Sequence, residues 1–324
     1  MNVESSQARA AASLRWDAVD AARGAAVAAM VVYHFTWDLS FLKLIETNIV
    51  EIPAWRWFAR CIAGSFLFLA GFGLALAHAH GLRRIPFLRR LMKVGGAALA
   101  VTLATFFAFP QSYIFFGILH AIAASSVLAL PFLRLRPAPV LAAAAFCLAA
   151  PHLFTSPALD APWLDWLGLG ILTPLTNDYV PIFPWFGPVL MGVAVGRILL
   201  SRRQTAGLAR WRARDPLSRA LAWAGRRSLP IYLVHQLALL ALLYGVLQIV
   251  GPNPAAEARP FMEPCEATCR QSARPQTCRA ACSCTVASMR ESDLWRKFLD
   301  NRIDGQDQVR ISRAAQQCLR GAPP

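Results

Sequence analysis

Residues 17–41 read DAVDAARGAAVAAMVVYHFTWDLSF, and this stretch decides the fold. From residue 21 onward it is predominantly apolar and long enough to cross a bilayer, which takes roughly 20 residues of helix. Six more apolar stretches follow along the chain. Together they predict an all-α protein, a polytopic transmembrane helix bundle of about seven spans, at residues 21–41, 55–77, 93–109, 114–132, 140–154, 182–200 and 229–250.

The composition of the whole chain agrees with a membrane protein. Of its 324 residues, 56% are hydrophobic and only 16% are charged. Such a chain buries more apolar surface than a disordered protein has, so disorder is excluded. The net charge of +15 would indicate nucleic-acid binding only if it lay on one soluble surface. Most of the basic residues lie between apolar stretches, so we expect a lipid bilayer as partner and no nucleic acid.

The basic residues also orient the chain. They gather before the first apolar stretch and in the second, fourth and sixth connections, whereas the other connections carry more acidic residues. Because basic loops stay in the cytoplasm, this pattern predicts a multi-pass inner (plasma) membrane protein with a cytoplasmic N-terminus and an extracytoplasmic C-terminus. Residues 163–175 are apolar but short, and we expect them to be interfacial or re-entrant.

The expected domains are a cytoplasmic segment at residues 1–20, a transmembrane domain at 21–252 and a cysteine-rich helical tail at 253–324. Six of the eight cysteines lie in the tail. Four of them form C-x3-C-x8-C-x3-C, which suits a helical hairpin with two cysteines on one face of each arm. Six cysteines allow fifteen pairings, and a zinc site is the alternative to disulfides. The hairpin predicts the pairs Cys265–Cys282 and Cys269–Cys278, which leaves Cys284 to pair with Cys318.

Ionisable residues inside the first span are the main candidates for a functional site, because such groups are costly in lipid. Arg23 and His34 are eleven residues apart, so they share a helix face to within about 20° and stand roughly 16 Å apart. Asp38 follows His34 by one turn and is expected to accept its N–H. Asp20 precedes Arg23 by one turn and is expected to steady its guanidinium. Between the two ends, small residues such as Gly24 are expected to leave room for a slender ligand.

Four motifs in the same order resemble a known family. They are the Arg23-x10-His34 spacing with the Tyr33–Phe41 run, and then FGILH at 116–120, IFPWFGP at 182–188 and GRRSLPIYLVHQ at 225–236. The first is similar to the R-x10-H signature of acyltransferase-3-type membrane acyltransferases. All four resemble the bacterial branch related to heparan-alpha-glucosaminide N-acetyltransferase. The resemblance covers about residues 14–250 and leaves out the tail.

The resemblance implies transfer of an acetyl or other acyl group from cytoplasmic acyl-CoA, usually acetyl-CoA, to an extracytoplasmic carbohydrate amine or hydroxyl. Arg23, with Asp20, would hold the anionic CoA head, and His34 would be the general base with Asp38 orienting it. The lysosomal enzyme's catalytic histidine lies in a loop after its first helix. The loop at 42–54 here contains no histidine, so a ternary mechanism is favoured over an acyl-histidine intermediate. No metal is expected.

Two further histidines complete the predicted site. His120 is expected at a depth comparable with that of His34 and is counted as catalytic. His235 is expected near the inner end of the last span, where it contacts CoA or holds two helices together. Two other functions stay open: a glycan or lipid transporter or flippase, for which internal repeats are expected, and a membrane haem protein with histidine axial ligands.

Overall fold

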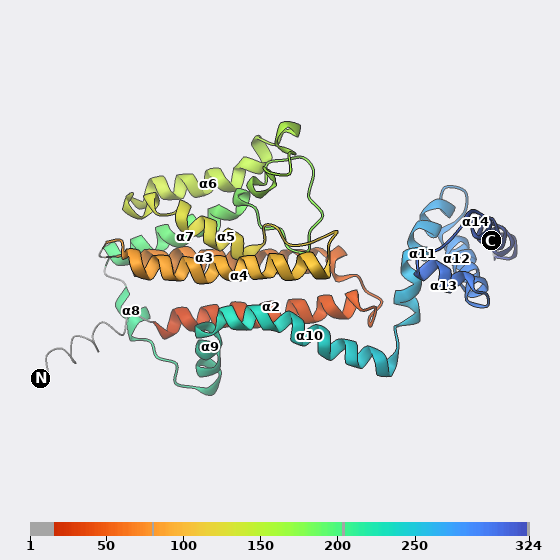
Figure 1. The fold of residues 1–324 in the computed structure, drawn as a ribbon, viewed down its shortest axis with the longest axis horizontal. Helices are drawn as coiled ribbons and strands as arrows, with labels where there is room; N and C mark the ends of the chain where they lie inside the picture. The colour runs from red at the N-terminus through yellow and green to blue at the C-terminus, as the bar shows by residue number, and fades with distance from the viewer. Residues whose placement is uncertain (1–15, 80, 203–204, 323–324) are drawn as a thin grey trace, which may run out of the picture. The chain divides into compact units, whose positions relative to one another are not determined.

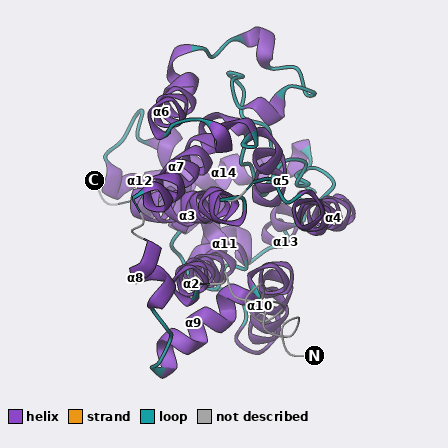
Figure 2. Cartoon of the chain, turned by 90° about the vertical axis from the view of Figure 1, so that its left-hand side faces the viewer, coloured by secondary structure: helices purple, strands orange, loops and turns teal. Residues whose placement is uncertain are grey.

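The computed structural model describes residues 16–79, 81–202 and 205–322, and these residues form helices and loops with no strand among them (Figures 1 and 2). Residues 1–15 of the predicted cytoplasmic segment (1–20) lie outside the described residues. The chain divides into two compact units. One comprises Met1–Phe35 with Val50–Leu240, and the other comprises Thr36–Ile49 with Ala241–Pro324.

Every one of the seven predicted spans contains a helix. Four helices are long and apolar enough to cross a membrane: α3 (Pro53–Ala77), α4 (Arg84–Ala108), α7 (Ile182–Ser201) and α10 (Ser228–Val250). The others are α2 (Asp17–Phe41) and two shorter apolar helices, α5 (Ile118–Leu128) and α6 (Pro137–Leu153). The all-helical bundle is confirmed, whereas the number of spans and their orientation stay predictions.

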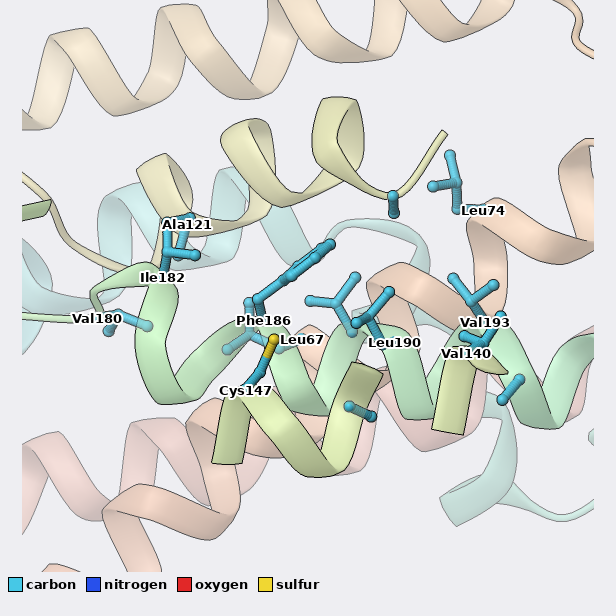
Figure 3. Close-up of a cluster of buried hydrophobic side chains, with 14 of the residues drawn as sticks. Leu67, Leu74, Ala121, Val140, Cys147, Val180, Ile182, Phe186, Leu190 and Val193 are labelled. Atoms are coloured by element: carbon cyan, nitrogen blue, oxygen red, sulfur yellow. The ribbon is translucent and has the colours of Figure 1, made fainter. Parts of the chain in front are cut away.

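The core of the first unit lies between α3, α5, α6 and α7. Leu67 and Leu74 come from α3, Val140 from α6, and Leu190 and Val193 from α7; each is at most 2% exposed. Figure 3 shows these side chains meeting between the helices. Long helices that pack so closely form a rigid frame, because interiors at this density resist small displacements.

Helix α5 begins at Ile118, four residues later than the sequence predicts for its span. Both backbone groups of Ile114 are bound by side chains of α4: its N–H donates to Thr105 (3.0 Å) and its carbonyl accepts from Thr102 (2.7 Å). A residue whose backbone is held in this way cannot also enter the first turn of a helix. The stretch before α5 is therefore a loop tied to α4.

The short apolar segment expected to be interfacial or re-entrant contains only two 3-10 turns, Pro157–Leu159 and Asp165–Leu167. Its continuation runs beside the loop before α5. The N–H of Asn177 donates to the carbonyl of Ser112 (3.0 Å), and that of Val180 donates to Phe116 (3.1 Å). Two loops from distant parts of the chain thus support each other, while their depth in a membrane stays a prediction.

The tail forms α11 (Pro254–Cys269), α12 (Pro275–Arg290), α13 (Leu294–Leu299) and α14 (Gly305–Gly321). It contains the three predicted disulfides, with Cα–Cα distances of 6.0 Å (Cys265–Cys282), 5.5 Å (Cys269–Cys278) and 5.7 Å (Cys284–Cys318). The predicted pairing is confirmed. It excludes the zinc site because all six thiols are used.

The helical tail is interrupted between α12, which ends at Arg290, and α13, which begins at Leu294. Ser292 explains the break, since its hydroxyl donates to the carbonyl of Met289 (3.1 Å) and accepts from the N–H of Leu294 (3.4 Å). A serine that bonds to the backbone in this way ends one helix and begins the next. The turn lets Trp295 pack beside Met289 in the small core of the tail.

Candidate functional site

The site begins where α2 crosses α9 (Pro216–Arg226). A Cβ on Gly24 would lie 1.9 Å from the carbonyl oxygen of Leu221, and a Cβ on Gly225 would lie 1.8 Å from that of Asp20. Only glycine fits at either position. The crossing joins the Arg23-x10-His34 motif to the start of the GRRSLPIYLVHQ motif. The prediction that Gly24 leaves room for a slender ligand is wrong, because the main chain of α9 occupies the space beside it.

Acidic residues of α2 tie the crossing together. A carboxylate oxygen of Asp17 accepts from the N–H of Ala213 (3.3 Å), and the other lies 3.7 Å from Arg226. Asp20 is buried and accepts from the guanidinium of Arg23 at 3.3 Å. The contact predicted between Asp20 and Arg23 is therefore present.

Arg23 faces a small residue and a second cation. A Cβ on Gly73 of α3 would meet only the Nη2 atom of Arg23, at 3.7 Å. Arg90 of α4 lies within electrostatic range of Arg23. Two neighbouring guanidinium groups repel each other unless an anion lies near both. Positive charge from α2 and α4 thus gathers at this end of α2, with Asp20 as the nearest printed counter-charge of Arg23.

His34 meets His235 at the other end of the motifs. The two ring centroids are 4.9 Å apart, with the planes inclined by 65°. The prediction that His235 lies near the inner end of its span, away from His34, is therefore wrong. The physical reason is that α2 begins before α10 and uses its first two turns to pack on α9. From the glycine crossing to the histidine contact, α2 and α10 run side by side in the same direction (Figure 1).

The hydrogen bonds of His235 determine which nitrogen carries its proton. Its Nδ1 lies 2.7 Å from the carbonyl oxygen of Tyr232, and a carbonyl only accepts, so Nδ1 is the donor. The Nε2 atom of neutral His235 therefore carries a lone pair. Among the described residues, neither this Nε2 nor the Nδ1 of His34 has a hydrogen-bond partner, although both atoms are buried. Each histidine therefore keeps one buried ring nitrogen that makes no hydrogen bond within the described part of the chain.

Comparison with known proteins identifies the family of this arrangement. The sequence profile of the family described as heparan-alpha-glucosaminide N-acetyltransferase, catalytic, matches residues 15–237. The chain belongs to this family. The matched range contains both motif glycines and both histidines of the pair, and it ends before the disulfide-bonded tail. Neither a curated protein nor a solved structure matches the chain.

In this N-acetyltransferase family member, His120 is held apart from the histidine pair. Its Nδ1 accepts from the N–H of Gly117 (3.3 Å), and its Nε2 lies 3.1 Å from the hydroxyl of Thr102. That hydroxyl gives its own proton to the carbonyl of Ile114, so it accepts from His120. Both ring nitrogens thus secure the start of α5 against α4, and a catalytic role for His120 stays a prediction.

Asp38 is completely buried one turn beyond His34 on α2, and its predicted hydrogen bond to His34 stays a prediction. Sequence reasoning missed two other residues beside the site, Arg90 and Asp178. Asp178 accepts from the N–H of Ile118 (2.9 Å) at the start of α5. Burial raises the pKa of Asp178 to about 6, although the bond from Ile118 opposes the shift. A carboxylate four residues before the IFPWFGP motif offers no sequence signal for this role.

Aromatic rings surround the histidine pair on the side of α3. The ring centroid of Tyr33 lies 5.6 Å from His34, 6.3 Å from Trp55 and 6.4 Å from Phe58. All three aromatic side chains are partly exposed. They give the His34 end of the site an aromatic wall of tilted rings, whereas the Arg23 end is cationic.

Proposed function

We propose that this protein is a membrane acyltransferase that moves an acetyl group from cytoplasmic acetyl-CoA to an extracytoplasmic sugar amine or hydroxyl. The observation that carries the proposal is the pair His34–His235, with one buried, unpartnered nitrogen on each ring. The pair lies in a chain that belongs to an N-acetyltransferase family. Paired imidazoles with free nitrogens suit a reaction that moves a proton while an acyl group changes partners.

The donor binds along α2 in this proposal. Arg23 and Arg90 hold the pyrophosphate of CoA, because two adjacent guanidinium groups need an anion of matching charge. Gly73 of α3 lies against the guanidinium of Arg23, and the pantetheine arm passes this glycine as it runs away from the phosphates. From Arg23, the arm follows α2 over roughly 16 Å to His34. The thioester then lies beside the histidine pair.

The reaction is a direct transfer between donor and acceptor. His34 removes a proton from the acceptor while the acceptor nitrogen or oxygen forms a bond to the acetyl carbonyl carbon. The C–S bond breaks, and the thiolate of CoA leaves with the proton that His34 returns. The ring of His235 lies against that of His34, and His235 uses its Nε2 lone pair to stabilise the imidazolium that forms. Asp38 orients His34 from the next turn of α2.

The acceptor enters from the side of the aromatic wall. Tyr33, Trp55 and Phe58 present ring faces and edges near His34, and the C–H faces of a sugar pack well against such rings. This places a carbohydrate rather than a second charged molecule at that end. Whether the sugar offers an amine or a hydroxyl depends on the acceptor itself.

The orientation of the chain follows from the same proposal. With seven spans and a cytoplasmic N-terminus, the Arg23 end faces cytoplasmic CoA in the inner membrane, and the tail lies outside. The three disulfides support this orientation, since such bonds persist in oxidising compartments and are rare in the cytosol.

A transfer assay tests the proposal. Purified full-length protein in detergent is given radiolabelled acetyl-CoA and a mixture of hexosamines and simple glycans, and label on the sugar is measured. We expect transfer by the wild type and a loss of about 100-fold or more in His34→Ala. His152→Ala is the matched control, because this histidine is exposed at the end of α6. Full transfer by His34→Ala, or none by the wild type, would overturn the proposal.

A further inference from the structure

The short helix α9 exposes apolar side chains on the side that is turned away from its crossing with α2. Leu217 is 69% exposed and Trp223 is 50% exposed. Ala220 lies between them along the helix and is exposed as well. At 100° per residue these three positions fall within about 120° of one another. We call them the outward strip of α9.

Arginines lie beside the outward strip. The guanidinium of Arg227 lies over the indole ring of Trp223, 4.8 Å from the ring centroid, and Arg219 is exposed on α9 itself. In the part of the chain that the structure describes, neither arginine forms a salt bridge. The one acidic residue between positions 202 and 227, Asp215, accepts from the backbone and the hydroxyl of Ser218. The positive charge beside the strip is therefore left for an external anion.

The position of α9 places the outward strip at a membrane surface. Helices α7 and α10 are both long and apolar enough to cross a membrane, and α9 ends at Arg226, two residues before α10 begins at Ser228. Figures 1 and 2 show that α9 runs across α2 and α10 and not along them. A helix that joins two spans and runs across them lies in the plane of the interface, with its outer side toward lipid.

The orientation of the chain does not explain the outward strip. Basic residues collect in cytoplasmic loops whether or not they bind anything, so the arginines alone would carry little information. That rule does not require apolar side chains to be exposed in the same loop. On a helix that faced only water, the buried side at Ala222 and Gly225 would be balanced by a polar outer side. The outer side of α9 instead carries Leu217 and Trp223.

We propose that the outward strip of α9, with Arg219 and Arg227, binds an anionic phospholipid at the bilayer surface. This inference does not depend on the acyl transfer proposed above. Leu217 and Trp223 lie at the boundary between headgroups and acyl chains, where indole rings and apolar side chains are favoured. Each guanidinium donates two parallel hydrogen bonds to phosphate oxygens. A zwitterionic lipid carries its own cation, which opposes the arginines, so the site favours headgroups with a net negative charge.

Native mass spectrometry of the full-length protein in detergent tests this site. The protein is titrated with dioleoyl phosphatidylglycerol, which is anionic, and separately with dioleoyl phosphatidylcholine, which is zwitterionic. We expect the wild type to bind phosphatidylglycerol more tightly. The double variant Arg219→Gln/Arg227→Gln should lose about 25-fold of that affinity, roughly fivefold for each arginine near the surface. Its affinity for phosphatidylcholine should stay within about twofold of the wild-type value.

Two further double variants show what the arginines contribute. Arg219→Lys/Arg227→Lys keeps both charges, so its affinity for phosphatidylglycerol should stay within about threefold of the wild-type value. Arg134→Gln/Arg136→Gln is the matched control, because it removes two exposed arginines from another connection that is predicted to be cytoplasmic. It should bind phosphatidylglycerol as the wild type does.

Three results would overturn the proposal. The first is equal affinity of the wild type for the two lipids. The second is an equal loss in the matched control, because the general charge of the loops, and not α9, would then attract the lipid. The third concerns the oligomeric state, which the same spectra report. A wild-type dimer that becomes a monomer in Arg219→Gln/Arg227→Gln would show that a second copy of the chain covers the outward strip.

Discussion

The ring of His34 lies 4.9 Å from that of His235, although the two residues stand near opposite ends of the matched domain. The contact exists because α2 crosses α9 at Gly24 and Gly225, and α10, which follows α9 directly, then runs beside α2. Two motifs that are separate in sequence therefore form a single site, with a cationic end and a histidine end. Whether the residues of this site act together can be tested directly.

If the histidines act as one unit, their effects are not additive. We expect His34→Gln and His235→Gln each to lower the rate of acetyl transfer by about 100-fold or more. The double variant should be little slower than the less active of the two single variants. The rate constants of the four proteins form a double-mutant cycle. Independent, multiplicative losses would show that the two rings contact each other without sharing a catalytic task.

Arg90 is expected to affect donor binding rather than chemistry. In Arg90→Gln, the KM for acetyl-CoA should rise by about tenfold while kcat stays within a factor of about two, because the lost contact is made equally in the ground state and the transition state. Steady-state kinetics against acetyl-CoA measure this. Arg89→Gln is the matched control, since Arg89 is exposed on the same helix. A fall in kcat with an unchanged KM would place Arg90 outside the donor site.

The glycine crossing sets the stability of the first unit. Gly24→Ala should lower the melting temperature by several degrees, because a methyl group at this position meets a main-chain carbonyl that cannot move aside. Gly95→Ala on α4, where no atom lies within 4 Å of the added Cβ, should have no such effect, since alanine is the better helix former. Equal melting temperatures for both variants would mean that α9 does not stay against α2.

Disulfides of different span stabilise the tail to different degrees. In the chain-entropy estimate, Cys284–Cys318 contributes about 4 kcal/mol for its separation of 34 residues, and Cys269–Cys278 about 2.5 kcal/mol for nine. Replacing both cysteines of Cys284–Cys318 by serine should therefore speed hydrogen exchange in α12 and α14 more than replacing both cysteines of Cys269–Cys278. Exchange measured by mass spectrometry on full-length protein decides this. The reverse order would mean that packing around Met289, and not chain entropy, dominates.

The stability of the first unit is expected to depend on pH through Asp178. Burial raises its folded pKa to about 6, above the ordinary value of 3.8, so the folded protein holds the proton more tightly than the unfolded chain. The stabilisation is complete below about pH 4 and is lost as the pH rises through about 6, a change on the order of 2–3 kcal/mol. Asp178→Asn keeps an acceptor for Ile118 without a charge. Compared with the wild type, it should gain in melting temperature as the pH rises from about 3.5 to 7.5; a difference independent of pH would contradict this assignment.

The sequence predicted the features that depend on local spacing. Seven apolar stretches became helices because apolar length alone specifies them. The cysteine pairs were predictable because C-x3-C puts two thiols on one helix face and the hairpin brings the faces together. Arg23 and Asp20 met as expected because three residues make nearly one turn.

The features that depend on the relative positions of helices were not predictable. Which residue contacts His34 depends on how far α2 extends along α9 before α10 begins. The residue spacing within either motif does not predict that distance. Arg90 is one of several arginines at the start of α4 in the sequence, and only the packing of the helices brings it within electrostatic range of Arg23. The late start of α5 depends on two threonines of α4 that bind Ile114, a contact between residues whose sequence gives no sign of pairing.

The crossing at Gly24 and Gly225 has a consequence for the evolution of this protein. The obstacle that each glycine faces is a carbonyl group of the opposite main chain, at Leu221 and at Asp20. Every amino acid has that group, so no second substitution on the opposing helix makes room for a side chain. A genetic selection for suppressors of Gly24→Ala should return the original glycine and few compensating changes at the crossing. Both positions are thus fixed independently of each other, and lineages that keep this packing cannot drift at either one.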